Sequence, residues 1–158
     1  MKHNLEKHLR LIAKALIQEM QRNIVAEKRV ASKDLLNSFE YEITDEGILI
    51  TNKQEYSGNV DLGRRPGLPP PISKIIRWMD QKRIRGRSRE SGRFMRKRDS
   101  AFYIARKIGD IGYPGINYVS KSLGKFKDII ALDIGEAYVK DLETMLQENI
   151  SKFDLNTN

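Results

Sequence analysis

The sequence lacks cysteine, and among its 158 residues it has only two histidines, His3 and His8. Without cysteine the chain has neither disulfide bonds nor thiolate metal sites. Both histidines fall at the start of the first predicted helix, which is a poor place for an imidazole zinc site or a Ser-His-Asp triad. Walker-type and dinucleotide-binding glycine patterns are also missing from the sequence. We therefore expect a protein that is not an enzyme and that needs no cofactor and no metal.

Long hydrophobic runs are absent as well. No apolar stretch approaches the ~20 residues that a membrane-spanning helix needs, and the first residues do not form a signal-peptide pattern. We expect the chain to fold in a reducing cytoplasm and to have no membrane partner. Its length suits a single domain, and 39% apolar residues supply a core. We predict one domain over residues 1–150, followed by a flexible tail over 151–158.

Positive charge is concentrated in one short segment. The chain has 29 basic and 21 acidic residues, and nine of the basic residues but only one acidic residue, Glu90, lie between residues 82 and 98. The rest of the chain therefore holds 20 residues of each sign and is neutral. The basic residues of this segment, which we call the cationic loop, are Lys82, Arg83, Arg85, Arg87, Arg89, Arg93, Arg96, Lys97 and Arg98. A neutral body with one cationic segment indicates binding to a particular polyanionic surface.

Two long segments have the periodicity of amphipathic helices. Apolar residues recur at steps of three and four over residues 5–26 and 126–150. The first stripe is Leu5, Leu9, Ile12, Leu16, Met20 and Ile24. The second row, apolar except for Asp141, is Phe126, Ile130, Ile134, Ala137, Asp141 and Met145. Lys7, Lys14, Glu19 and Arg22 fall off the first stripe, so we expect them in water.

Between these helices the pattern predicts a β-hairpin. Phe39, Tyr41 and Ile43 alternate with two glutamates, a turn follows over 45–47, and residues 48–51 form the return strand. Residues 56–71 are so dense in glycine and proline that we expect only a short edge strand over 59–62. Tyr56 is expected to pack on the sheet.

Three shorter helical segments complete the prediction. A brief turn capped by Ser32 is expected at residues 34–36, and a helix over 72–82 follows three consecutive prolines and places Trp78 in the core. Asp99 or Ser100 caps a helix over 101–108, which Gly109 and Gly112 end. The predicted fold class is α+β, with a small antiparallel sheet packed by helices, long N-terminal and C-terminal helices and an extended basic loop.

The middle of the chain resembles a family of tailed-bacteriophage tail components and head–tail connector (neck) proteins. The match covers roughly residues 31–119. Its specificity comes from the order and spacing of the matching pieces and not from any single piece. The pieces are residues 31–39, the Tyr-Ser-Gly and Gly-Arg-Arg-Pro-Gly stretch within 55–67, Pro69 to Ile72, Ile75 to Met79, Ala101 to Ile108 and Gly112 to Gly115. The chain departs from the family pattern at residues 115–119, where the family has a Pro-Phe-Leu stretch, and in its longer and more basic insertion.

The resemblance implies a structural virion protein. Such a protein forms a ring of identical subunits in the neck or tail-completion region, around the channel through which DNA leaves. Its partners would be adjacent portal, adaptor or tail proteins and packaged DNA, and it would be located in the virion after assembly in the host cytoplasm. A ring requires one patch of a subunit to meet a different patch of the next. The N-terminal helix and the Pro-rich segment are candidates for these patches.

The cationic loop has three interpretations from the sequence. It can bind DNA phosphates, it can bind carboxylates of a protein partner, or it can be a solvated loop that only promotes solubility. Gly86, Ser88, Ser91 and Gly92 would keep it flexible until contact, and Phe94 and Met95 add an apolar anchor. A cytoplasmic nucleic-acid-binding protein that uses residues 82–98 is the alternative to the virion ring.

A second candidate site lies in the Pro-rich segment. Asp61, Arg64, Arg65 and Pro66 form a hypothetical subunit contact, in which the arginines meet Asp61 of a neighbour. An internal ion pair with Asp61, or plain exposure of the arginines, explains the same residues equally well.

Overall fold

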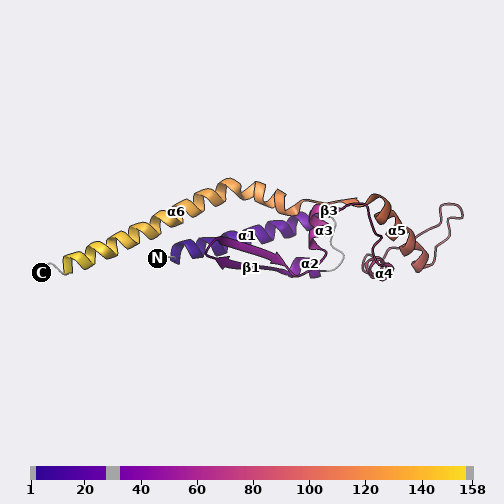
Figure 1. The fold of residues 1–158 in the computed structure, drawn as a ribbon, viewed down its shortest axis with the longest axis horizontal. Helices are drawn as coiled ribbons and strands as arrows, with labels where there is room; N and C mark the ends of the chain where they lie inside the picture. The colour runs from indigo at the N-terminus through magenta and orange to yellow at the C-terminus, as the bar shows by residue number, and fades with distance from the viewer. Residues whose placement is uncertain (1–2, 28–32, 156–158) are drawn as a thin grey trace. The chain divides into compact units, whose positions relative to one another are not determined.

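The computed structural model of the chain describes residues 3–27 and 33–155 and has an α+β fold with a small antiparallel sheet and long helices toward both ends (Figure 1). The chain divides into two compact units. Unit 1 comprises residues 1–23, 39–52 and 118–158, and unit 2 comprises residues 24–38 and 53–117. A compact unit is not necessarily an independent domain, so the single domain over 1–150 stays a prediction.

Unit 1 is built on two long helices, as the periodicity predicted. Helix α1 runs over His3–Ala26 and helix α6 over Tyr118–Leu155. Ile12, Leu16 and Met20 of the first predicted stripe are buried. Helix α6 begins eight residues before the predicted start at Phe126, and it continues through residues 151–155, which were predicted as tail. Residues 156–158 lie outside the described residues.

The predicted β-hairpin of unit 1 is confirmed. Strands β1 (Phe39–Thr44) and β2 (Gly47–Asn52) pair antiparallel, from Phe39 opposite Asn52 to Thr44 opposite Gly47, so the turn has two residues rather than three. Phe39, Tyr41 and Ile43 are half-buried while the intervening glutamates are exposed. The Phe39 ring meets Tyr118 edge to face with centroids 6.0 Å apart, which packs the hairpin against the start of α6.

Polar contacts join α1 to α6. Asn23 donates a hydrogen bond to Ser122, and Lys125 Nζ lies 2.8 Å from Glu19 Oε1. The prediction that Glu19 stays in water is therefore wrong, because its side chain is only 10% exposed and pairs with Lys125 and, at 3.5 Å, with Arg22. The hydrogen bond from Lys125 lowers the pKa of Glu19 below its ordinary value of 4.5.

Unit 2 contains the shorter elements. They are α2 (Asp34–Asn37), α3 (Ser57–Leu62), β3 (Gly63–Arg64), α4 (Ile72–Gln81), α5 (Lys97–Ile111) and β4 (Tyr113–Pro114). The N-cap position of α2 is Lys33, which makes no side-chain cap, and the predicted cap Ser32, like Ala31 of the family resemblance, lies outside the described residues.

The predicted edge strand over 59–62 is wrong. These residues belong to helix α3, and the strand comes next as β3, which pairs antiparallel with β4 through Gly63 opposite Pro114 and Arg64 opposite Tyr113. The backbone carbonyls of Val60 and Asp61 accept hydrogen bonds from residues 116 and 117, at 3.1 and 2.8 Å. A long-range backbone contact thus fixes this segment, and local glycine and proline content did not reveal it. Tyr56 was expected on the sheet but is 43% exposed just before α3.

The core of unit 2 lies between α4 and α5. Ile75 and Met79 of α4 pack with Ala101 and Ala105 of α5, and half-buried isoleucines surround them. The prediction that Trp78 is a core residue is wrong, because its side chain is 38% exposed. Helix α5 begins at Lys97 rather than Ala101, with neither Asp99 nor Ser100 as its cap, and passes through Gly109, whose bare Cα faces Pro69 and the carbonyl of Gly67.

A candidate polyanion-binding loop

The cationic loop leaves α4 through a Schellman motif. The N–H of Ile84 donates to the carbonyl of Met79 at 2.8 Å, and the N–H of Arg83 donates to that of Asp80 at 3.1 Å. Arg83 occupies the position that usually holds glycine and has a φ of 53°. Ile84 then packs against the core that contains Met79. The end of α4 therefore sets the direction in which the loop begins.

Beyond this point the loop folds back as an irregular hairpin. Arg87 and Phe94 form an isolated antiparallel bridge, and the N–H of Met95 donates to the carbonyl of Gly86 at 3.0 Å. Ser88 donates its N–H to Arg93 at 2.9 Å and accepts from Gly92 at 3.0 Å, so residues 88–93 form the tip. The glycines and serines of the loop predict flexibility, which stays a prediction, and the structure shows backbone pairing between its two arms.

Both arms of the loop contact α5 or α4 near the base. A Cβ atom added at Gly86 would overlap the hydroxyl of Ser100 and lie 2.8 Å from the Ser100 Cβ. Ser100 is buried, and its hydroxyl donates to the Arg96 carbonyl at 3.2 Å in the first turn of α5. Lys97 forms an ion pair with Asp80 of α4. Contacts with α4 and α5 thus hold both arms of the loop at its base.

The arginine side chains of the loop are exposed. In residues 3–27 and 33–155, no ion pair is formed by these seven arginines, which are Arg83, Arg85, Arg87, Arg89, Arg93, Arg96 and Arg98. Lys97 differs because Asp80 neutralises it, and Lys82 is half-buried at the end of α4. Seven guanidinium groups within residues 83–98 therefore have their donors available for an external anion.

Phe94 gives this loop an apolar element. Its side chain is 59% exposed, and the guanidinium carbons of Arg87 and Arg85 lie 4.5 and 6.0 Å from its ring centroid. A cation placed over an aromatic face is attracted by the ring quadrupole. The loop consequently presents an aromatic ring flanked by two positive charges, and Met95 beside it is half-buried.

The residues predicted as a subunit contact lie together around β3. Asp61 is buried at the end of α3, Arg64 is half-buried and its guanidinium donates to the Leu68 carbonyl, and Arg65 and Pro66 are exposed. The exposed pair remains accessible to a neighbour, whereas Asp61 and Arg64 already make internal contacts. The predicted subunit contact stays a prediction.

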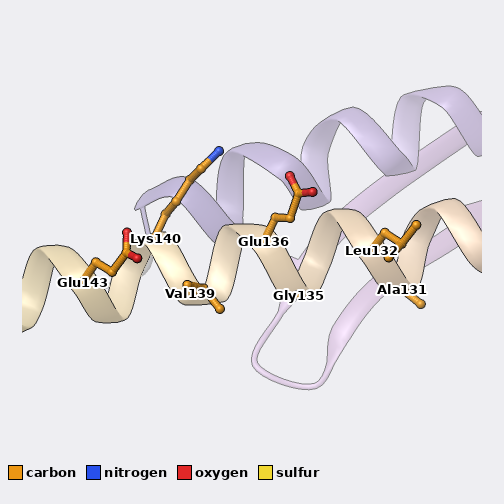
Figure 2. A pocket seen from close by; sticks show the side chains of 7 residues that line it. All are labelled: Ala131, Leu132, Gly135, Glu136, Val139, Lys140 and Glu143. Carbon is orange, nitrogen blue, oxygen red and sulfur yellow. The ribbon is translucent and has the colours of Figure 1, made fainter.

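Clustered metal ligands and helices apolar enough to span a membrane are absent from the described part of the chain, and hollows occur on unit 1. No group of three or more His, Asp or Glu side chains that could hold a metal ion occurs in residues 3–27 and 33–155. Over the same residues no helix has the length and apolarity to span a bilayer. Shallow hollows on unit 1 include one lined by residues of the β1–β2 hairpin and one along α6, whose lining residues all belong to that single helix (Figure 2).

Sequence reasoning identified the loop residues but missed the surface on α6. The signal was present as Leu132, Val139 and Leu146, which repeat at seven residues and fall outside the row from Phe126 to Met145 that was predicted for this helix. No protein-family model matches this chain, and neither the curated proteins nor the solved structures contain a significant match to it.

Proposed function

We propose that this chain is a non-enzymatic structural protein of a tailed bacteriophage, which forms a ring in the head–tail region around the DNA channel. The observation that carries the proposal is the cationic loop, in which seven exposed arginines without ion pairs in the described chain project from a base fixed by α4 and α5. Such a surface suits a structural connector that binds acidic neighbours or DNA.

The chemistry of the loop supports a binding role. A guanidinium group presents five N–H donors in a planar fork that matches carboxylate and phosphate oxygens. Holding seven of these groups together without acidic partners costs free energy through mutual repulsion, and a bound polyanion relieves that repulsion. A merely solubilising segment would not require the backbone pairing at Arg87 and Phe94 or the close contact of Gly86 with Ser100.

The residues that resemble the phage family lie in the same part of the chain as the cationic loop. They fall mainly on α3, β3, α4, α5 and β4 of unit 2, and of these α4 and α5 hold the base of the loop. The resemblance and the cationic loop therefore concern the same part of the molecule.

The test of this role is the location of the polypeptide. We expect mass spectrometry of purified particles of the encoding phage to detect it in several copies per particle, and we expect the purified protein to sediment as an oligomer. Absence from mature particles, or a strictly monomeric protein at all concentrations, would overturn the proposal.

Nucleic-acid binding is the second candidate function, favoured by the exposed arginines next to Phe94. If the loop binds duplex DNA without sequence preference, the logarithm of affinity falls with the logarithm of salt concentration, with a slope near −0.9 per phosphate contacted. The comparison is the wild type against a variant with Arg85, Arg87, Arg89 and Arg93 changed to Gln. Absence of DNA retention by the wild type at ~50 mM salt removes this candidate.

A further inference from the structure

The outer face of α6 carries an apolar row that no described residue covers. Leu132, Val139 and Leu146 are 68%, 52% and 56% exposed. They are seven residues apart, which is nearly two helical turns, so they lie on one side of the helix about 10.5 Å apart. Exposed apolar side chains that gather on one face, rather than scatter singly, mark a surface that binds a partner.

Carboxylates run beside this apolar row. Glu136 and Glu143 are exposed, are also seven residues apart, and form no ion pair within residues 3–27 and 33–155. In Figure 2 the Glu136 and Lys140 side chains rise from one edge of α6 while Ala131 and Val139 lie on the opposite edge. Among the exposed residues of 128–148 four are acidic and one is basic, so the accessible part of this stretch has an excess of three negative charges.

Gly135 leaves a gap in the middle of this face. A Cβ atom added there would meet no atom within 4 Å, and the surrounding hollow is lined by Leu132, Glu136 and Val139 among others (Figure 2). Glycine in a helix interior costs about 1 kcal/mol relative to alanine. The absence of a side chain at Gly135 leaves room for a bulky group of a partner, which would explain why glycine is present there.

A complementary occupant is apolar where it meets Leu132 and Val139 and cationic along the one edge that carries Glu136 and Glu143, on which Lys140 also lies. The cationic loop has this composition, since Phe94 is 59% exposed with Arg87 and Arg85 against its ring. The excess of eight positive charges in residues 82–98 is complementary to the acidic stretch of α6.

We propose that the cationic loop of one copy of this chain docks on the outer face of α6 of a second copy. Phe94 lies over Gly135 between Leu132 and Val139, and arginines of the loop pair with Glu136 and Glu143. The two surfaces differ, so the contact is heterologous and its repetition gives a closed ring or an open filament. This inference rests on the proposed function, because it identifies the polyanionic partner of the loop as the neighbouring subunit.

Cysteine cross-linking tests the contact directly, since the chain has no cysteine of its own. One full-length protein carries Phe94→Cys and a second, with a larger tag, carries Gly135→Cys, so a disulfide between them joins two separate chains. The matched control replaces Gly135→Cys with Glu46→Cys in the exposed hairpin turn. A mixed dimer with Gly135→Cys but not with Glu46→Cys supports the proposal, whereas no mixed dimer, or equal yields from both pairs, overturns it.

A second variant separates assembly from folding. Gly135→Leu fills the gap while adding a better helix former at an open position, so its melting temperature should equal or exceed that of the wild type. We expect its self-association, measured by sedimentation velocity, to be at least tenfold weaker. The control Gly124→Leu changes another α6 glycine whose Cβ would also meet nothing within 4 Å, and it should self-associate like the wild type. Unchanged association of Gly135→Leu overturns the proposal.

Charge reversal distinguishes this proposal from the function on which it rests. We expect Glu136→Lys with Glu143→Lys to abolish self-association, and we expect Arg87→Glu with Arg93→Glu in the second protein to restore mixed assembly. If the loop variant loses binding to particles or DNA but self-associates normally, this inference fails and the proposed function stands. If neutralising the loop alters neither self-association nor binding to particles or DNA, both this inference and the proposed function fail.

Discussion

Asp141 of helix α6 caps the N-terminus of helix α1. Its carboxylate accepts hydrogen bonds from the backbone N–H of Leu5 at 3.1 Å and of Asn4 at 3.3 Å, across a sequence separation of 136 and 137 residues. These N–H groups belong to the first turn of α1, where no carbonyl of the helix can accept them. A side chain of α6 thus completes the N-terminus of α1, and the helix dipole favours its negative charge.

The first prediction concerns this cap. We expect Asp141→Ala to lower the melting temperature, because it leaves two N–H donors of α1 without acceptors and removes a charge from the helix N-terminus. Asp141→Asn keeps one acceptor oxygen and should have a smaller effect. Glu143→Gln, an equal loss of charge on an exposed residue of the same helix, is the control and should leave the melting temperature unchanged. Equal melting temperatures for all three variants would contradict the prediction.

The second prediction is a loss of stability in acid. Hydrogen bonds lower the pKa of Asp141 below its ordinary value of 3.8, chiefly through Leu5, and that of Glu19 below 4.5, chiefly through Lys125. A depressed folded-state pKa contributes stability that is complete above the ordinary pKa and disappears as pH falls through the folded-state value. Urea unfolding between pH 7 and pH 2 should therefore show the free energy of unfolding falling below about pH 4. In Glu19→Gln with Asp141→Asn this fall should be shallower; the same slope as the wild type would contradict the assignment.

The third prediction concerns the base of the cationic loop. Gly86→Val should destabilise the protein by about 1–3 kcal/mol, because the new side chain overlaps buried Ser100 and must displace α5 or the loop. The control is Gly58→Ala in α3, where an added Cβ meets nothing within 4 Å and alanine favours the helix by up to about 1 kcal/mol. Chemical denaturation measures both. A tolerated Gly86→Val would show that the loop is not packed against α5 in solution.

The fourth prediction concerns Arg83 at the end of α4. Its positive φ of 53° costs roughly 1–2 kcal/mol for a residue with a Cβ, and glycine avoids this cost. We expect Arg83→Gly to leave stability unchanged or to raise it by about 1 kcal/mol while removing one positive charge from the loop. Weaker polyanion binding with undiminished stability would mean that the arginine is retained for binding. Arg83→Lys, which keeps the charge and the strained backbone, is the control and should show the wild-type stability.

Periodic patterns predicted the elements that have a continuous apolar face. The helices over 5–26 and 126–150 and the hairpin from Phe39 are confirmed, because their patterns reflect the side that packs on a neighbour. The start of α6 at Tyr118 was missed, since it depends on the contact of Phe39 with Tyr118 rather than on periodicity. The helix at α3 and the strand at β3 were missed for a similar reason, as their backbone partners lie near residues 113–117.

The candidate site was predictable in composition but not in form. Nine basic residues within 82–98 are evident from the sequence, whereas the Schellman motif at Arg83 and the bridge between Arg87 and Phe94 depend on the positions of α4 and α5. The errors at Glu19 and Trp78 have one cause. Burial of such a side chain depends on its contacts with other elements, which the local sequence does not reveal. Glu19, for example, can be buried because it forms an ion pair with Lys125 of α6.

The contact of Gly86 with Ser100 separates the loop into two parts that can change at different rates. Ile84 touches the core, Gly86 touches the buried serine and Lys97 pairs with Asp80, so substitution at these positions disturbs the protein body. Positions 89–92, by contrast, are exposed to solvent. Evolution can therefore change the sequence of the tip, and with it the binding partner, while the base of the loop stays the same.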